Sequence, residues 1–347
     1  MNIQRSFLIA IFLVVLYWIL KLYDPFLVVI TVAVLLSVAT NNINKYIRKH
    51  LGNKTISAIL STLLLFILFF APLIYIITNS GEVINNFDMS LVNKTINYIK
   101  HINFKLPDTF SFLQGNLDSF IKSIDLTTIT KTGLSYLGAI GKNSANFLKD
   151  MLLILIFFFF VTLHAKELGL YFRSILPMKS DDVDMVFGEV SNVMSVVFYS
   201  ILITAIFEGA LFAVISVVFG YNGLLFGIFY GFASLIPIIG GALIWLPLSA
   251  YSFANGNYVE GFTIALYSII VISIIADTFI KPLIIKYINS KLSNIKANTN
   301  EMLIFFAIFA GLTTFGFWGM ILGPAITTLF ISLMTMFKSI RERGLDI

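Results

Sequence analysis

Long apolar runs separated by short polar segments dominate the pattern along this chain. An α-helix needs about 20 mostly apolar residues to cross the hydrocarbon core of a bilayer, and many of the runs approach that length. The candidate spanning segments are 6–23, 25–41, 56–78, 151–166, 199–220, 224–236, 238–254, 259–280, 303–319 and 320–337. The pattern therefore predicts an all-α polytopic membrane protein.

Two regions in the second half leave their topology open. Residues 224–254 and 303–337 each return the chain to the side of the membrane on which the region starts. Each is either two full spans or one broken, re-entrant helical hairpin, and several of the segments are shorter than a full span.

The first apolar run, 6–20, follows Arg5 and so has the outline of a secretory signal peptide. No small-residue cleavage site follows it, and the stretch Lys21–Pro25 leads directly into a second apolar run. We therefore expect two retained membrane helices at 6–23 and 25–41.

Composition supports the membrane assignment. Hydrophobic residues make up 58% of the chain and charged residues only 12%, whereas about a quarter of a soluble domain is charged. The sequence has no cysteine, and its three histidines lie far apart without metal-ligand spacing, so we expect no metal and no cofactor. No basic cluster is interleaved with aromatic residues, which argues against nucleic acid and leaves membrane lipid as the expected partner.

Basic residues indicate the orientation, because loops on the cytoplasmic side carry an excess of lysine and arginine. A cytoplasmic N-terminus places four groups of basic residues inside, together with the C-terminus. The groups are Lys45, Arg48, Lys49 and Lys54; Arg173 and Lys179; Lys281, Lys286, Lys291 and Lys296; and Lys338, Arg341 and Arg343.

Two polar stretches divide the chain. Residues 1–79 hold the N-terminal membrane helices, and 80–149 form an extracytoplasmic arm with apolar residues at helical spacing. Residues 150–347 form a membrane transport core that includes a cytoplasmic helix within 167–198. Ser180 followed by Asp181 and Asp182 is typical of a helix start, with acids near the positive end of the helix dipole.

Glu208 lies inside the apolar segment 201–220. A carboxyl at membrane depth is costly and usually faces a cavity or a partner, so Glu208 could carry a proton or bind a cation. The alternative is a structural glutamate hydrogen-bonded to a neighbouring helix.

Asp277 and Lys281 are four residues apart, which places them on one helix face with the acid first, the favourable order. They form either a gate that opens when the ion pair breaks or a salt bridge that anchors the helix end. Pro282 follows, and we expect the chain to bend there.

Helix breakers interrupt the most apolar parts of the second half. The first break has Pro237, Gly240, Gly241 and Pro247, and the second has Gly311, Gly316, Gly319, Gly323 and Pro324. Broken helices at membrane depth occur only inside protein or along a water-filled cavity, where freed backbone groups can bind ions or polar solutes. These residues are the candidate substrate path, and tight hairpins without a ligand are the alternative.

The three most distinctive segments are IPIIGGALIWLP at 236–247, DTFIKPLII at 277–285 and GLTTFGFWGMILGPA at 311–325. In residues, order and spacing they resemble the autoinducer-2 exporter family, the PerM-like permeases. Ala310 departs from the glycine that is frequent at that place. The resemblance implies a permease of a bacterial inner membrane with about eight spans that self-associates, and members are assigned to export of autoinducer-2 or to Na⁺(Li⁺)/H⁺ antiport.

The leading hypothesis is a secondary transporter that exports a small polar solute of the autoinducer-2 kind. A Na⁺(Li⁺)/H⁺ antiporter that uses Glu208 is the second, and a structural homo-oligomer assembled through the arm is the third. The sequence lacks the G-x-x-x-x-G-K-[ST] pattern of ATP-hydrolysing P-loops and any nucleophile–base motif, so we do not expect an enzyme.

Overall fold

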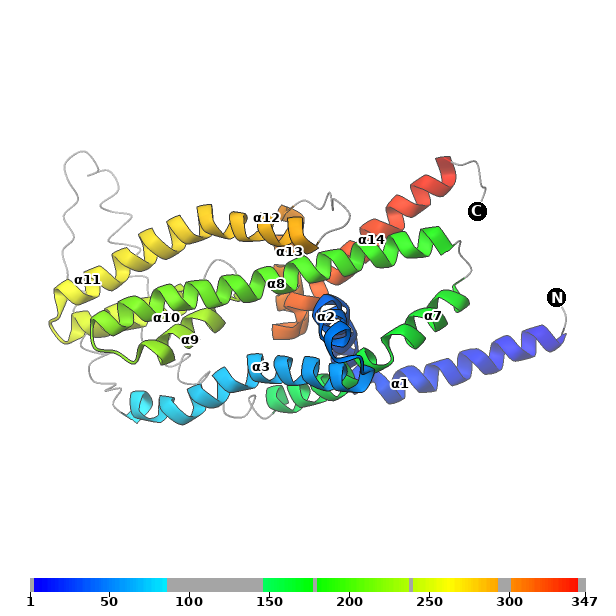
Figure 1. The fold of residues 1–347 in the computed structure, drawn as a ribbon, viewed down its shortest axis with the longest axis horizontal. Coiled ribbons are helices and arrows are strands. Elements are labelled where there is room, and N and C mark those ends of the chain that lie inside the picture. The colour runs from blue at the N-terminus through cyan, green and yellow to red at the C-terminus, as the bar shows by residue number, and fades with distance from the viewer. Residues whose placement is uncertain (1–2, 86–145, 177–179, 237–239, 293–300, 343–347) are drawn as a thin grey trace. The chain divides into compact units, whose positions relative to one another are not determined.

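The computed structural model describes residues 3–85, 146–176, 180–236, 240–292 and 301–342, and every regular element in these ranges is a helix (Figure 1). The elements are α1 (Ile3–Ala39), α2 (Asn41–Leu51), α3 (Lys54–Asn85), a helix at 146–163, α7 (Ala165–Ile175), α8 (Ser180–Val218), α9 (Gly223–Ala233), α10 (Ala242–Ala254), α11 (Tyr258–Tyr267), the π-helix η2 (Ser268–Ile280), α12 (Lys281–Leu292), α13 (Glu301–Phe315), the 3₁₀-helix η3 (Gly316–Trp318) and α14 (Gly319–Glu342). The predicted all-α fold is confirmed.

Six helical stretches of the described chain are long and apolar enough to cross a membrane, and two shorter apolar helices accompany them. The long stretches are Phe7–Ala39, Lys54–Ile76, Asn146–Leu163, Asp182–Val218, Tyr258–Ile288 and Met302–Lys338, and the shorter ones are Gly223–Ala233 and Ala242–Phe253. This set confirms a multi-pass membrane protein, with α13 and α14 together making up the last stretch. Most of the predicted external arm, residues 86–145, lies outside the described residues.

The expected pair of helices at 6–23 and 25–41 is wrong, because α1 runs through both segments without a turn. Pro25 lies inside the helix, where it removes only one backbone donor and leaves the apolar flanks helical on both sides. At 1.5 Å per residue α1 is about 55 Å long, more than the thickness of one bilayer core.

The described residues between 167 and 198 belong to two helices. These helices are α7 and the first half of α8. An ion pair connects them, with Arg173 Nη2 2.6 Å from Asp184 Oδ1. The predicted helix start at Ser180 is confirmed, and α8 runs on from there to Val218.

The chain forms two compact units, and the boundary between them falls inside α3 and α8. One unit comprises the described parts of Met1–Phe66, Leu148–Phe198 and Leu292–Ile347. Within it, α13 and α14 form a helical hairpin whose turn contains Gly316 at φ 62°. A Cβ on Gly311 would collide with the carbonyl of Gly319, so these glycines let the two backbones touch.

The other unit comprises the described parts of Ile67–Phe147 and Tyr199–Lys291. Here α9 and α10 form a short hairpin of 11 and 13 residues. These helices are about 16 and 20 Å long, short of the roughly 30 Å hydrocarbon core. We infer from these lengths that residues 223–254 enter the membrane as a re-entrant hairpin. The long helix α11–η2–α12 follows and bends near the start of α12 (Figure 1), close to Pro282 as predicted.

Candidate ion-coupling and transport site

Glu208 is the most buried acid among the described residues of the second unit. It lies in the middle of α8 with 3% of its surface exposed. Its Oε1 is 3.6 Å from Nζ of Lys281 and makes no hydrogen bond within the described chain. An ion pair at this depth keeps the carboxylate compatible with its apolar surroundings, and removing either partner would leave a costly uncompensated charge.

Lys281 also pairs with Asp277, one turn earlier on the same helix. Its Nζ donates to Asp277 Oδ1 at 3.0 Å. One lysine therefore serves two carboxyls, and the ionised cluster carries one net negative charge. The Lys281 and Asp277 side chains are each about two-fifths exposed, whereas Glu208 is enclosed. The cluster thus has a buried end and an open end, and it can accept one proton or one monovalent cation.

The backbone beneath Asp277 and Lys281 is unusual. Asp277 lies in the last turn of the π-helix η2, and Lys281 follows its end, where the N–H of Lys281 bonds to the carbonyl of Ala276. π-Helical segments occur frequently at functional sites. Pro282 has no N–H, so a carbonyl of the preceding turn loses its helical donor. The cluster therefore sits where the helix already departs from regular geometry.

A line of buried polar side chains on α8 leads to Glu208. Ser200, Thr204 and Glu208 follow at intervals of four residues, and their exposed fractions are 8%, 5% and 3%. Neither hydroxyl has a hydrogen-bond partner in the described chain, whereas Ser195 donates to the carbonyl of Ala39 at 3.0 Å. Buried polar groups are normally satisfied, so these two hydroxyls form an unusual polar stripe on α8 that ends at Glu208.

The α9–α10 hairpin lies beside the same acid. Tyr230 and Ser234, at the end of α9, are within electrostatic range of the Glu208 carboxyl. Tyr230 also stacks on Phe212 of α8, with ring centroids 4.6 Å apart. Gly241, at the start of α10, packs so closely against the Tyr230 ring that a Cβ there would collide with the hydroxyl.

The predicted substrate path is thus only partly assembled in one unit. Gly240 and Gly241 form the turn of the α9–α10 hairpin, where a Cβ on Gly240 would collide with the carbonyl of Ala233, and Pro247 lies inside α10. Pro237 lies outside the described residues. The other predicted residues belong to the α13–α14 hairpin of the first unit; they are Gly311, Gly316, Gly319, Gly323 and Pro324.

The sequence analysis did not single out Glu260. Its carboxyl accepts hydrogen bonds from residues before α9 and at the end of α10, away from the turn of the α9–α10 hairpin. The hydroxyls of Tyr221 and Ser252 donate to its Oε1 at 2.5 and 2.7 Å, and Nδ2 of Asn257 donates to Oε2 at 3.3 Å. Burial, and then the bond to Glu260, raise the pKa of Tyr221 to about 12. The only signal in the sequence was that Glu260 ends the long uncharged run after Glu208.

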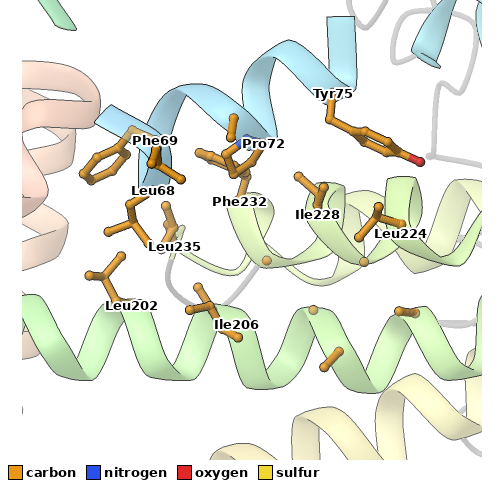
Figure 2. A pocket seen from close by; sticks show the side chains of 18 residues that line it. Leu68, Phe69, Pro72, Tyr75, Leu202, Ile206, Leu224, Ile228, Phe232 and Leu235 are labelled. Atoms are coloured by element: carbon orange, nitrogen blue, oxygen red, sulfur yellow. The ribbon is translucent and has the colours of Figure 1, made fainter. Parts of the chain in front are cut away.

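The opposite face of α8 borders a cavity of about 660 Å³ between α3, α8 and α9 (Figure 2). Leu202, Ile206 and Gly209 contribute from α8, and Leu68 and Tyr75 contribute from α3. Within the second unit, one side of α8 therefore carries Glu208 and the opposite side lines an apolar cavity.

Long apolar helices and a broken hairpin define this protein as a multi-pass membrane protein. The chain belongs to the AI-2E transporter family, since residues 7–339 match the family described as AI-2E family transporter. This confirms the resemblance seen in the three segments.

Similar proteins come from both bacteria and archaea, and each bears the name "Putative transport protein". One from Helicobacter pylori (strain ATCC 700392 / 26695) is 34% identical over 335 residues, which cover 96% of each chain. One from Aquifex aeolicus is 25% identical over 76% of this chain and 74% of its own. One from Pyrococcus horikoshii, with the suffix PH1000, is 23% identical over 86% of this chain and 78% of its own.

Proposed function

We propose that this protein is a proton-coupled secondary transporter that exports a small polar solute of the autoinducer-2 kind. The observation that carries the proposal is the buried Glu208, held by one lysine that a second acid shares. Membership of a transporter family supports the class of activity.

Glu208 would work through two charge states. When ionised, it shares Lys281 with Asp277. When protonated, it is neutral and releases Lys281 to Asp277 alone, so that the buried end of the cluster loses its ion pair. A proton can therefore switch the contact between α8 and the α11–η2–α12 helix, and the unpartnered hydroxyls of Ser200 and Thr204 offer a polar approach to it.

Solute flux in proteoliposomes tests the proposal. An imposed pH gradient should drive autoinducer-2 across the membrane with wild-type protein, and Glu208→Gln should reduce this flux by at least tenfold. Glu189→Gln is the matched control, because Glu189 also lies on α8 but accepts a bond from Ser332 at 2.6 Å in the other unit. Gradient-driven flux at the wild-type rate in folded Glu208→Gln protein would contradict the proposal.

Na⁺(Li⁺)/H⁺ antiport is the second candidate function. The net negative charge of the cluster and its carboxylate oxygens, which are hard ligands, favour it. A pulse of Na⁺ or Li⁺ outside vesicles with a trapped pH dye should then raise the internal pH without any organic solute. No change in internal pH would leave solute export as the function.

We further propose that the protein resides in a bacterial inner membrane with its basic segments and C-terminus in the cytoplasm, and that it self-associates through residues 80–149. The distribution of lysine and arginine supports the orientation. The amphipathic pattern of the arm supports the assembly. An unchanged oligomer size in native mass spectrometry after deletion of residues 86–145 would overturn the proposed role of the arm.

A further inference from the structure

The cavity on the apolar face of α8 has the wrong chemistry for a polar solute. Its walls are leucine, isoleucine, phenylalanine, alanine, proline and glycine, and the Tyr75 hydroxyl is the one polar side-chain group among them. A sugar-like solute there would lose its hydrogen bonds to water without replacement. The cavity therefore takes an apolar ligand, and it is separate from the cluster around Glu208.

Small residues create the hollow. Ala205, Gly209 and Ala213 recur every four residues on α8, and Gly227 and Gly231 do the same on α9. A Cβ on Gly209 would lie 2.5 Å from the carbonyl of Gly227, so the two backbones are in direct contact. Without large side chains at this seam, the neighbouring α3 leaves an open volume above it (Figure 2).

The cavity is walled by candidate membrane spans and bordered by exposed apolar side chains. Its wall residues on α3 and α8 belong to the candidate spans Lys54–Ile76 and Asp182–Val218. At its rim, Ile67, Ile206 and Leu224 keep 54%, 62% and 59% of their surfaces exposed. The medium around such side chains in a bilayer is lipid hydrocarbon, which fills an open apolar volume better than water does.

One end of the cavity is polar. The hydroxyl of Tyr75 and the side-chain amide of Asn222 are within hydrogen-bond distance at 3.4 Å. Tyr75 lies at the end of the cavity near Leu224 (Figure 2), close to the ends of both spans, at Ile76 and Val218. Tyrosine is enriched at this depth, where a lipid headgroup meets its acyl chains.

We propose that this cavity binds one acyl chain of a membrane phospholipid, with the ester and headgroup at Tyr75 and Asn222 and the chain running toward Leu68 and Leu202. The volume is within the usual range for a bound small molecule, and the single polar end fixes the direction of the lipid.

The test uses detergent-purified protein and native mass spectrometry, followed by photocrosslinking with a phosphatidylethanolamine that carries a diazirine in its acyl chain. Ala210→Phe and Ala71→Phe fill the cavity from two walls. Val214→Phe is the matched control, because Val214 is also exposed on α8 but does not line the cavity. Wild type and Val214→Phe should each retain one phospholipid per chain, and both filling variants should lose it.

Crosslinks in the wild type should map to α3, α8 and α9 and fall at least fivefold in each filling variant. Added phospholipid should also raise the melting temperature of the wild type and the control more than that of the filling variants. The proposal is overturned by equal retention and crosslinking in all four proteins, by a retained ligand that is not a phospholipid, or by the absence of retained lipid from the wild type.

Discussion

At the scale of single residues, the protein depends on a shared lysine. Lys281 is close to both Glu208 and Asp277, but the two acids differ in their surroundings. Glu208 is enclosed, so its charge depends on the lysine. Asp277 is partly exposed, so solvent can stabilise its charge in place of Lys281. Lys281 therefore matters more to Glu208 than to Asp277, although Asp277 is its near neighbour in sequence.

Removal of the lysine should reveal this difference. Lys281→Met should lower the free energy of unfolding by about 1–3 kcal/mol, because it leaves Glu208 buried without a partner. Asp277→Asn should cost only about 0.2–0.5 kcal/mol, the value of an exposed pair at i, i+4. Thermal stability assays in one detergent can rank these variants against the wild type.

A double variant separates the ion pair from general packing. Glu208→Gln should recover part of the stability lost in Lys281→Met, with a coupling energy of about 0.5–3 kcal/mol. Additive losses in the double variant would show that Lys281 stabilises the protein without pairing with Glu208.

At the scale of helices, glycine sets how closely the elements approach. Gly227 touches α8 so tightly that a Cβ would lie 2.8 Å from both the Gly209 carbonyl and the Ala213 side chain. Gly169 lies in α7, and a Cβ there would meet nothing within 4 Å. The same residue type is therefore a packing requirement in one helix and a flexible position in the other.

Alanine substitutions should have opposite effects at these two positions. Gly227→Ala should destabilise the second unit by about 1–3 kcal/mol through overpacking. Gly169→Ala should stabilise the protein by about 0.4–1 kcal/mol, because alanine restricts the unfolded chain. Equal melting temperatures for the two variants would contradict the close packing of α8 and α9.

The sequence predicted the spans well because the length of an apolar run reflects bilayer thickness directly. It did not predict that α1 continues through Pro25, because a helix can lose one backbone donor and still continue. It also did not predict that α8 runs on past residue 198. It singled out Glu208, Asp277 and Lys281, but not the pairing of Glu208 with Lys281. That contact joins distant parts of the chain and leaves no periodic signal.

At the scale of the whole molecule, the continuity of α1 changes the expected topology. The prediction of a cytoplasmic N-terminus required two crossings before the basic segment at 41–54. If the single helix α1 crosses the membrane once, Gln4 and Lys45 lie on opposite sides of it.

The absence of cysteine from the sequence makes this testable with single-cysteine variants. In intact cells a membrane-impermeant thiol reagent should label Gln4→Cys, and it should label Lys45→Cys only after the membrane is opened. Both positions are exposed, so access depends on the membrane alone. Labelling of the two variants from the same side would show that the chain before Lys45 crosses twice or not at all.

The central claim is that Glu208 carries the coupling proton, and proton release by the purified protein tests it most directly. Autoinducer-2, Na⁺ or Li⁺ would be added to protein in weakly buffered detergent solution that contains a pH dye. Wild type and Glu189→Gln should acidify the solution, and Glu208→Gln should not. Equal acidification by folded Glu208→Gln protein would contradict the account and assign the proton to another group.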